Sequence, residues 1–343
     1  MQEIYGIIQL KKIKVYKNEV FKKHMSAFVI MIRNVILFAA LAVPGYILVK
    51  CNVLKQEHSA GFSKILMYVG MPFLIISGMV NNLSINKEFI IRILITAAIG
   101  VAYTLTLFFA SHPLSKVEKE EKKNGMMRFA IMFSNNGFLG IPLAAAVFGK
   151  SNFVFTALIV LNIITNVAMY SLGPYLVSGD KRYISIKKSL FNPVLIAFAA
   201  GLILNLINIK NYIPEVITYS DHFSGIVTPI SMTILGMKMA SVRMSSLFTS
   251  LKAYYVSILK LVACPLLIVS ILLIYNTLFG DTLSREIILA FFVAFSMPTA
   301  GLASTFADTF DGDTESAVVY TLSTTLLSIL TIPALYGILC MLI

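Results

Sequence analysis

Apolar residues run unbroken along most of the chain, and short polar gaps separate the runs. A helix needs about 20 mainly apolar residues to cross the hydrocarbon core of a bilayer, so each run predicts one membrane-spanning helix. The predicted spans are residues 29–50, 62–81, 89–111, 128–148, 153–177, 190–209, 216–239, 251–275, 286–307 and 315–342. The pattern predicts an all-α membrane protein of ten transmembrane helices with no soluble domain of appreciable size.

Composition supports a membrane protein and excludes a nucleic-acid-binding one. Hydrophobic residues make up 58% of the chain and charged residues 13%, whereas roughly a quarter of a soluble protein is charged. Mean hydropathy is +0.84. The net charge of +12 comes mainly from Lys and Arg in the gaps between spans, where they anchor membrane segments. The lipid bilayer is the expected partner, and no nucleic acid is expected.

The distribution of Lys and Arg also predicts an orientation. The loops after the first, third, fifth and seventh spans hold most of them, which favours a cytoplasmic side for these loops and an external side for both termini. Residues 1–24 carry six lysines and oppose this orientation. We expect residues 1–28 to be a basic leader, interfacial or disordered, and it is open whether 1–24 belong to the protein or whether Met25 is the start.

Metal and cofactor chemistry have little support in the sequence. Cys51, Cys264 and Cys340 are far apart, and none of the four histidines is paired at ligand spacing. The acidic stretch ADTFDGDTESA does not complete a calcium-binding EF-hand loop. Its Asp313 and Glu315 are instead expected to open the last helix, where carboxylates favour the helix dipole. We predict no metal and no cofactor.

Matching motifs predict that the chain contains two copies of one unit. Gly45 matches Gly201, Phe62-Ser63 matches Phe223-Ser224, and Phe133-Ser134 matches Phe295-Ser296, at separations of 156, 161 and 162 residues. Each unit, residues 29–178 and 179–343, contains five spans. Because five is odd, the second copy enters the membrane from the opposite side. Inverted repeats of this kind are typical of secondary transporters.

The fourth and ninth spans are each interrupted by polar and helix-breaking residues. They read RFAIMFSNNGFLGIPLAAAVFG and FFVAFSMPTAGLASTFAD. Proline removes a backbone donor, and glycine and asparagine are poor formers of helix interiors. Interrupted backbone at membrane depth is tolerated only where protein or a water-filled cavity receives it. The two breaks are therefore expected to meet near the midplane, where the positive ends of half-helices would attract an anion.

These breaks supply the predicted substrate-binding residues. They are Asn135, Asn136, Gly137, Gly140 and Pro142 in the fourth span, and Ser296, Met297, Pro298, Thr299 and Gly301 in the ninth. Four residues of neighbouring spans are candidates for substrate binding or coupling: Lys260, Asn162, Asn166 and Thr324. For Lys260, pairing with a substrate carboxylate and snorkelling to the interface are both open. Cavity lining and interhelical hydrogen bonds are both open for the polar residues.

The motifs SNNGFLGIPL, SMPTAGLASTFAD and VVYTLSTTLLSILTIP resemble those of the auxin efflux carrier family, over essentially residues 29–343. The resemblance implies a scaffold of helices 1, 2, 6 and 7 and a mobile transport part of helices 3–5 and 8–10. It also implies that broken helices 4 and 9 cross at Pro142 and Pro298, with the substrate beside them. The family moves organic anions, including auxin in plants and dicarboxylates such as malate or malonate in bacteria. Met297 stands before Pro298 where plant members carry Asn.

The sequence thus predicts a secondary carrier of small organic anions that works by alternating access in the cell membrane. A proton or sodium gradient is the expected coupling, and a homodimer is open. A membrane receptor that uses a transporter-like fold is the alternative. No enzyme is expected, because a catalytic set within the spans is missing: Asp221 and His222 are adjacent at a span start.

Overall fold

The computed structural model describes residues 28–343 except 83–84, 185–192, 241–248 and 281. Nearly all of the predicted leader, residues 1–28, therefore lies outside the described residues. Every element in the described part is a helix, and the strand-like pairing in it is a single isolated bridge between Ser134 and Thr299. The predicted all-α class is confirmed.

Helix bounds in the first half of the chain follow the predicted spans within a few residues, except that α6 begins at Glu121, seven residues before the predicted start of the fourth span. The first span is a helix over Phe28–Lys50 that ends in α2 (Val43–Lys50). The next elements are α3 (Ser59–Ile65), a π-helical turn (Leu66–Gly70), α4 (Met71–Asn82) and α5 (Lys87–Leu114). They are followed by α6 (Glu121–Met132), a second π-helical turn (Asn136–Gly140), α7 (Ile141–Phe148) and α8 (Phe153–Ser178).

The second half of the chain is likewise a series of helices. It contains α9 (Pro193–Leu206), α10 (Ile209–Tyr212), α11 (Glu215–Ser224), α12 (Val227–Ala240) and α14 (Leu251–Ile258). A third π-helical turn (Leu259–Ala263) leads into α15 (Cys264–Phe279), α16 (Arg285–Ser296), α17 (Ala303–Thr309) and α18 (Thr314–Leu342). Among the described residues, seven continuous helices are long and apolar enough to cross a membrane, and Asn136–Phe148 and Pro193–Leu206 are shorter apolar helices.

Proline explains where the π-helical turns lie. Each of the three turns directly precedes a helix whose second residue is proline: Pro72, Pro142 and Pro265. A proline ring clashes with the carbonyl four residues earlier, and the wider π turn moves that carbonyl away. Pro142 therefore lies inside a continuous helix over Asn136–Phe148. The fourth span is interrupted before Asn136, so the predicted break over Asn135 to Pro142 is confined to its beginning, and Pro142, where the resemblance implied the crossing, does not interrupt the helix.

The acidic stretch before α18 behaves as the sequence predicts. The Asp313 side chain accepts a hydrogen bond from the Ser316 amide, and Glu315 lies in the first turn. A side-chain oxygen at this position pairs an amide that the helix itself leaves free. No group of three or more His, Cys, Asp or Glu suited to a metal ion occurs within the described residues.

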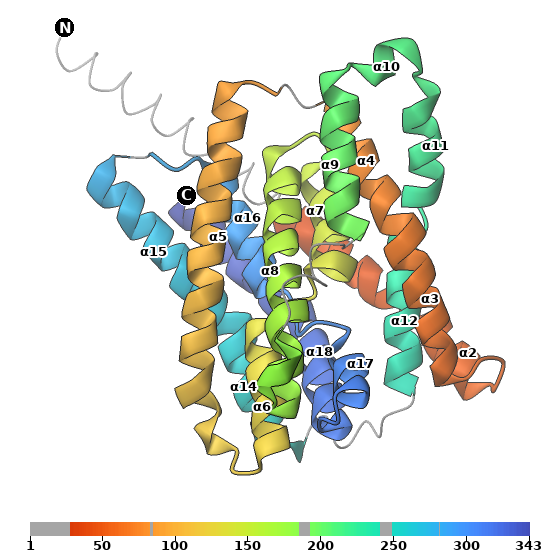
Figure 1. Ribbon diagram of the computed structural model, residues 1–343, viewed down its shortest axis with the longest axis vertical. Helices are drawn as coiled ribbons and strands as arrows, with labels where there is room; N and C mark the ends of the chain where they lie inside the picture. The colour runs from red at the N-terminus through yellow and green to blue at the C-terminus, as the bar shows by residue number, and fades with distance from the viewer. Residues whose placement is uncertain (1–27, 83–84, 185–192, 241–248, 281) are drawn as a thin grey trace, which may run out of the picture.

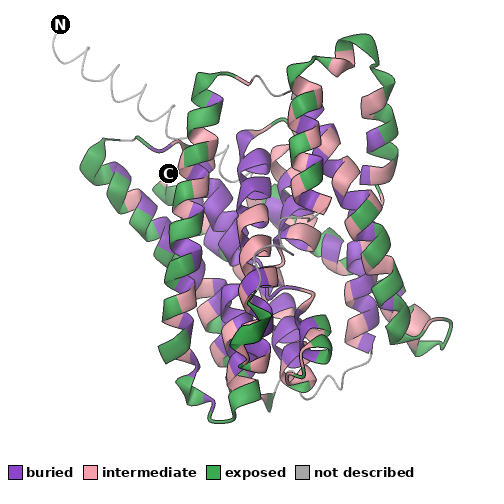
Figure 2. Cartoon of the chain, viewed as in Figure 1, coloured by how far each residue is buried: buried purple, intermediate pink, exposed green. Residues whose placement is uncertain are grey.

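The helices pack in two groups. In the first, α2 packs on α12, and α4 contacts both α9 and α11. In the second, α8 contacts α5, α6 and α16, and α18 contacts α14 and α17. Figure 1 shows the first group at the right and most of the second at the left and centre. In Figure 2 the buried residues gather on the central helices, and the outer faces of α5 and α15 are largely exposed.

Two glycines bring the first and seventh spans into backbone contact. A Cβ added at Gly45 would overlap the carbonyl oxygen of Thr233, and one added at Gly236 would overlap that of Ala42. Small residues are used in this way where membrane helices approach closely. Gly45, one of the residues on which the repeat prediction was based, is thus required for this close helix packing.

We expect Gly236→Val to destabilise the protein by about 3 kcal/mol, because the clash is with backbone that cannot turn away. A lower melting temperature of the detergent-solubilised protein would measure this effect. Gly61→Ala is the matched control, since nothing lies within 4 Å of a Cβ at Gly61. Equal melting temperatures for both variants would contradict the close contact.

Candidate functional site

The two interrupted spans cross and pair through their backbones. The Asn135 amide donates to the Pro298 carbonyl at 2.8 Å, and the Ala300 amide donates to the Phe133 carbonyl at 2.9 Å. These two bonds flank the bridge between Ser134 and Thr299. The break in each span therefore supplies the hydrogen-bond partners that the other lacks. The crossing is centred on Ser134 and Thr299, whereas the family resemblance implied a crossing at Pro142 and Pro298.

The carbonyl groups at the end of α6 are all paired, although no helix continues beyond Met132. The Ala130 carbonyl accepts from Thr299 Oγ1 at 3.1 Å. The carbonyls of Ile131 and Met132 both accept from Lys260 Nζ, at 3.1 and 3.3 Å. A helix end leaves its last four carbonyls without intrahelical partners, and here the ninth span and α14–α15 supply them.

Lys260 is fully buried. It therefore does not snorkel to an interface, which was one of the two predicted roles. Its Nζ sits at the negative end of α6, where a cation is favoured by the helix dipole. The lysine thus holds the first half of the broken span in place, and it does not line the pocket described below.

The second break is held from two sides. The Thr299 amide donates to Thr324 Oγ1 at 3.1 Å, so Thr324 of α18 stabilises the crossing without lining the pocket described below. From the other helix group, Lys238 Nζ of α12 reaches the Gly301 carbonyl at 2.5 Å and Ser304 Oγ at 3.5 Å. Lys238 lies at the end of the seventh predicted span, and nothing in its sequence neighbourhood indicates which carbonyl it reaches.

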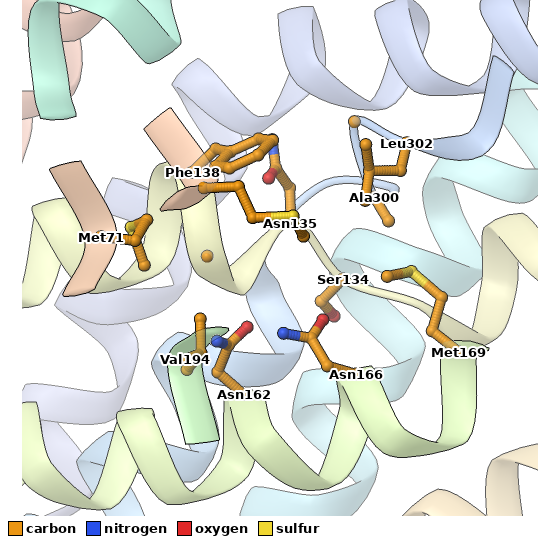
Figure 3. Close-up of a pocket in the computed structure, with 13 residues that line it drawn as sticks. Met71, Ser134, Asn135, Phe138, Asn162, Asn166, Met169, Val194, Ala300 and Leu302 are labelled. Atoms are coloured by element: carbon orange, nitrogen blue, oxygen red, sulfur yellow. The ribbon is translucent and has the colours of Figure 1, made fainter. Parts of the chain in front are cut away.

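A pocket opens beside the crossing. Its polar lining consists of Ser134 and Asn135 from the break and of Asn162 and Asn166 from α8, which point toward the broken segment in Figure 3. The other lining residues are Gly137, Phe138, Ala300, Gly301, Leu302, Met67, Met71, Met169 and Val194. None of the lining residues carries a charge.

Several buried polar atoms at the crossing have no hydrogen-bond partner among the described residues. These are Ser134 Oγ, Asn162 Nδ2 and both side-chain atoms of Asn136. Leaving a buried amide or hydroxyl unpaired costs free energy. Ser134 and Asn162 line the pocket, so a polar group bound there would pair with them.

Two glycines keep the pocket open beside its amides. A Cβ at Gly137 would lie 3.6 Å from Asn162 Oδ1, and one at Gly301 would lie 3.6 Å from Asn135 Nδ2. A larger side chain at either position would occupy the space next to these amide groups.

The structure gathers only part of the predicted site around the pocket. Five predicted residues line it: Asn135, Gly137, Gly301, Asn162 and Asn166. The others support the crossing or pack near it: Asn136, Gly140, Pro142, Ser296, Met297, Pro298, Thr299, Thr324 and Lys260. For example, a Cβ at Gly140 would lie 3.2 Å from Met297 Cγ. The apolar lining from α4, Met71, was not predicted, since one methionine in an apolar run carries no signal of its own.

Comparison with known proteins places the chain in a family. The family model described as membrane transport protein matches residues 29–186 and 181–336, which is nearly all of the described chain. The chain belongs to this family. The resemblance to auxin efflux carriers is thereby confirmed, and the protein is an integral membrane protein of a transporter family.

Two relatives are transporters of methane-producing archaea. A transporter of Methanothermobacter thermautotrophicus is 28% identical over 299 residues, which cover 85% of this chain and 93% of the relative. A transporter of Methanocaldococcus jannaschii is 29% identical over 214 residues, covering 60% of this chain and 68% of the relative. Both are named uncharacterised transporters, so their names support a role in transport but do not identify a substrate.

The unpaired amide of Asn136 and the paired ammonium of Lys260 predict opposite effects on stability. Asn136→Ala removes a buried polar group without partners and should leave the melting temperature unchanged or raise it. Lys260→Met leaves two buried carbonyls without donors and should cost about 3 kcal/mol. Thermal unfolding of the purified variants measures both, and a lower melting temperature for Asn136→Ala than for Lys260→Met would contradict the assignment.

Proposed function

We propose that this member of the membrane transport protein family is a secondary carrier of small organic anions, and that the anion binds in the pocket beside the crossing. The observation that carries the proposal is the start of the helix Asn136–Phe148 in this pocket. Beside that helix start lie two polar groups without protein partners, Asn162 Nδ2 and Ser134 Oγ.

The helix start supplies the attraction for an anion. The first amides of a helix have no intrahelical acceptor and carry the positive end of its dipole, and Gly137 and Phe138 of this first turn line the pocket. A carboxylate placed there would accept from these amides and from the Asn162 side-chain amide. The short helix α17 after the second break offers no comparable end.

The remaining lining narrows the class of anion. Met67, Met71 and Met169 together with Val194 and Leu302 make most of the pocket apolar, and flexible methionines adapt to varied apolar shapes. A second carboxylate would lie among these uncharged side chains at a high cost of desolvation, and the Lys238 ammonium beside Gly301 already donates to that residue's carbonyl. The pocket therefore favours a monocarboxylate with a small apolar body, such as an auxin-like acid, over malate or malonate.

Alternating access fits the two helix groups. We propose ten membrane crossings in two inverted repeats, with helices 1, 2, 6 and 7 as a scaffold. Spans 3–5 and 8–10 would form the moving part, which carries the crossing. The pairing of α2 with α12 and of α9 with α4 supports this division, since each pair joins the first span of one repeat to the second span of the other.

Further parts of the proposal concern setting and energy. The carrier would act in the cell membrane, with transport coupled to a proton or sodium gradient, and it would work alone or as a homodimer. A receptor with a transporter-like fold is the weaker alternative, because the family and both relatives are named for transport. Family membership also speaks for transport over catalysis.

Uptake by proteoliposomes tests the substrate class. We expect labelled 4-methylpentanoate or indole acetate to enter faster than malonate or malate, at equal concentrations and with an imposed proton or sodium gradient. Empty liposomes and excess unlabelled anion control for leakage. Faster uptake of the dicarboxylates would overturn the substrate class, and failure of all four anions to move would sink the carrier proposal for carboxylates.

Replacement of Asn162 tests the site. Asn162→Ala removes a donor to the bound carboxylate, and a hydrogen bond to a charged group is worth about 1.5–3 kcal/mol. We therefore expect the ratio of maximal uptake rate to KM to fall about ten- to a hundredfold, with an unchanged melting temperature. Asn211→Ala, at an exposed residue of α10, should behave as wild type. Normal uptake by Asn162→Ala would remove this pocket from the mechanism.

A further inference from the structure

One polar cluster joins the two helix groups away from the pocket. Lys150, in the connection between α7 and α8, places its Nζ 2.6 Å from Asp221 Oδ1. The same Nζ donates to Ser224 Oγ at 3.1 Å and to Ser77 Oγ at 3.2 Å. Ser77 Oγ in turn donates to Asp221 Oδ1 at 2.6 Å. We call these four residues the clasp.

The clasp connects what we have proposed to be the moving part and the scaffold. Lys150 follows α7, the second half of the broken span, whereas Ser77 belongs to α4, and Asp221 and Ser224 belong to α11. Next to the clasp the two groups pack without a gap: a Cβ added at Gly78 of α4 would overlap the ring of Phe155 of α8. The two groups are therefore closed together at this level.

The clasp and the pocket lie at different depths along the same helix. Met71 lines the pocket, and Ser77 is six residues further along α4, which is roughly 9 Å at 1.5 Å per residue. The clasp lies toward the side of the α7–α8 connection, which the distribution of Lys and Arg predicts to be external. Clasp and packed Phe155 thus stand between the pocket and that side.

We propose that the clasp is a releasable lock that closes the pocket to the external face and must open once in each transport cycle. The inference rests on the carrier function proposed above. The exposure of its charged pair suits this task, since the side chains of Lys150 and Asp221 are 29% and 46% exposed. Partly exposed ion pairs contribute little to stability, so this one can break and re-form without a large barrier.

A lock that is closed in only one state of the cycle affects transport differently from a contact that is kept in every state. An interaction made only in the state closed to the outside biases the equilibrium toward that state. Its loss raises the fraction of carriers open to the outside and lowers the fraction open to the inside. Because apparent affinity scales with the fraction of binding-competent molecules, KM should fall on the external face and rise on the internal face.

A second ion pair on the same side provides a matched control. Arg92 NH2 lies 2.9 Å from Glu286 Oε2, and the pair joins α5 to α16. Both helices belong to the proposed moving part, so this bond is kept in every state of the cycle. Its removal should change stability without shifting the two KM values in opposite directions.

The experiment measures KM from both faces in proteoliposomes of determined orientation. The probe is whichever of labelled 4-methylpentanoate, indole acetate, malate or malonate the wild type moves. We expect Asp221→Asn to lower the external KM and raise the internal KM, each by about three- to tenfold. Glu286→Gln should shift neither in this way, and the charge exchange K150D with D221K should return both KM values toward wild type.

The outcomes separate the lock from the carrier. If the wild type moves an anion and Asp221→Asn leaves both KM values unchanged, or moves both in one direction, the lock is wrong and the carrier stands. If the wild type moves none of the anions, the proposed function itself fails. Should Asp221→Asn not fold, Lys150→Met provides the same test, with melting temperature and gel filtration as the check on folding.

Discussion

The structure depends on one constraint, which is that every backbone polar group at membrane depth needs a partner inside the protein. Two interrupted spans can satisfy this constraint only by meeting, because each interruption frees amides and carbonyls that its own helix cannot pair. The mutual bonds of Asn135 with Pro298 and of Ala300 with Phe133 are the result. They fix where the two spans cross, and hence where a pocket with free helix amides can exist.

The same constraint explains the most unusual residue of the interior. A lysine with no exposed surface would be costly in an apolar environment. Lys260 is stabilised because it donates to two carbonyls at the negative end of α6, and those carbonyls would be unpaired without it. Cation and helix end thus compensate each other, and the first half of the broken span gains a fixed end close to the pocket.

The proposed function depends on a difference in hydrogen bonding between the two sides of the crossing. On the supporting side of the crossing, Thr299, Thr324 and Lys260 are all hydrogen-bonded, which makes the crossing rigid. On the pocket side, Ser134 Oγ and Asn162 Nδ2 have no partners in the described part of the chain, which leaves them able to hydrogen-bond a ligand. In the proposed transport cycle, the clasp on Lys150 is a contact between the helix groups that is released, since its charged side chains remain partly in contact with solvent.

The sequence by itself determined that the chain lies in a membrane, where its helices run and which two spans are interrupted. Apolar runs of about 20 residues predicted most of the span bounds to within a few residues. Residues such as Asp313 set the start of a helix through local hydrogen bonds. These features depend on neighbours along the chain, so pattern and composition predict them. The sequence also indicated that Asn135, Asn162 and Asn166 belong near a site, because polar groups within apolar runs need partners.

Only the tertiary structure decided which of these polar groups face a pocket and which face each other. It moved the crossing from Pro142 to Ser134, since a π-helical turn accommodates the proline ring. It gave Lys260 two carbonyl partners 128 and 129 residues away in sequence, and it brought Lys150 to Asp221. Such pairings depend on how helices pack side by side, and no local pattern encodes the partner of a long, flexible lysine side chain.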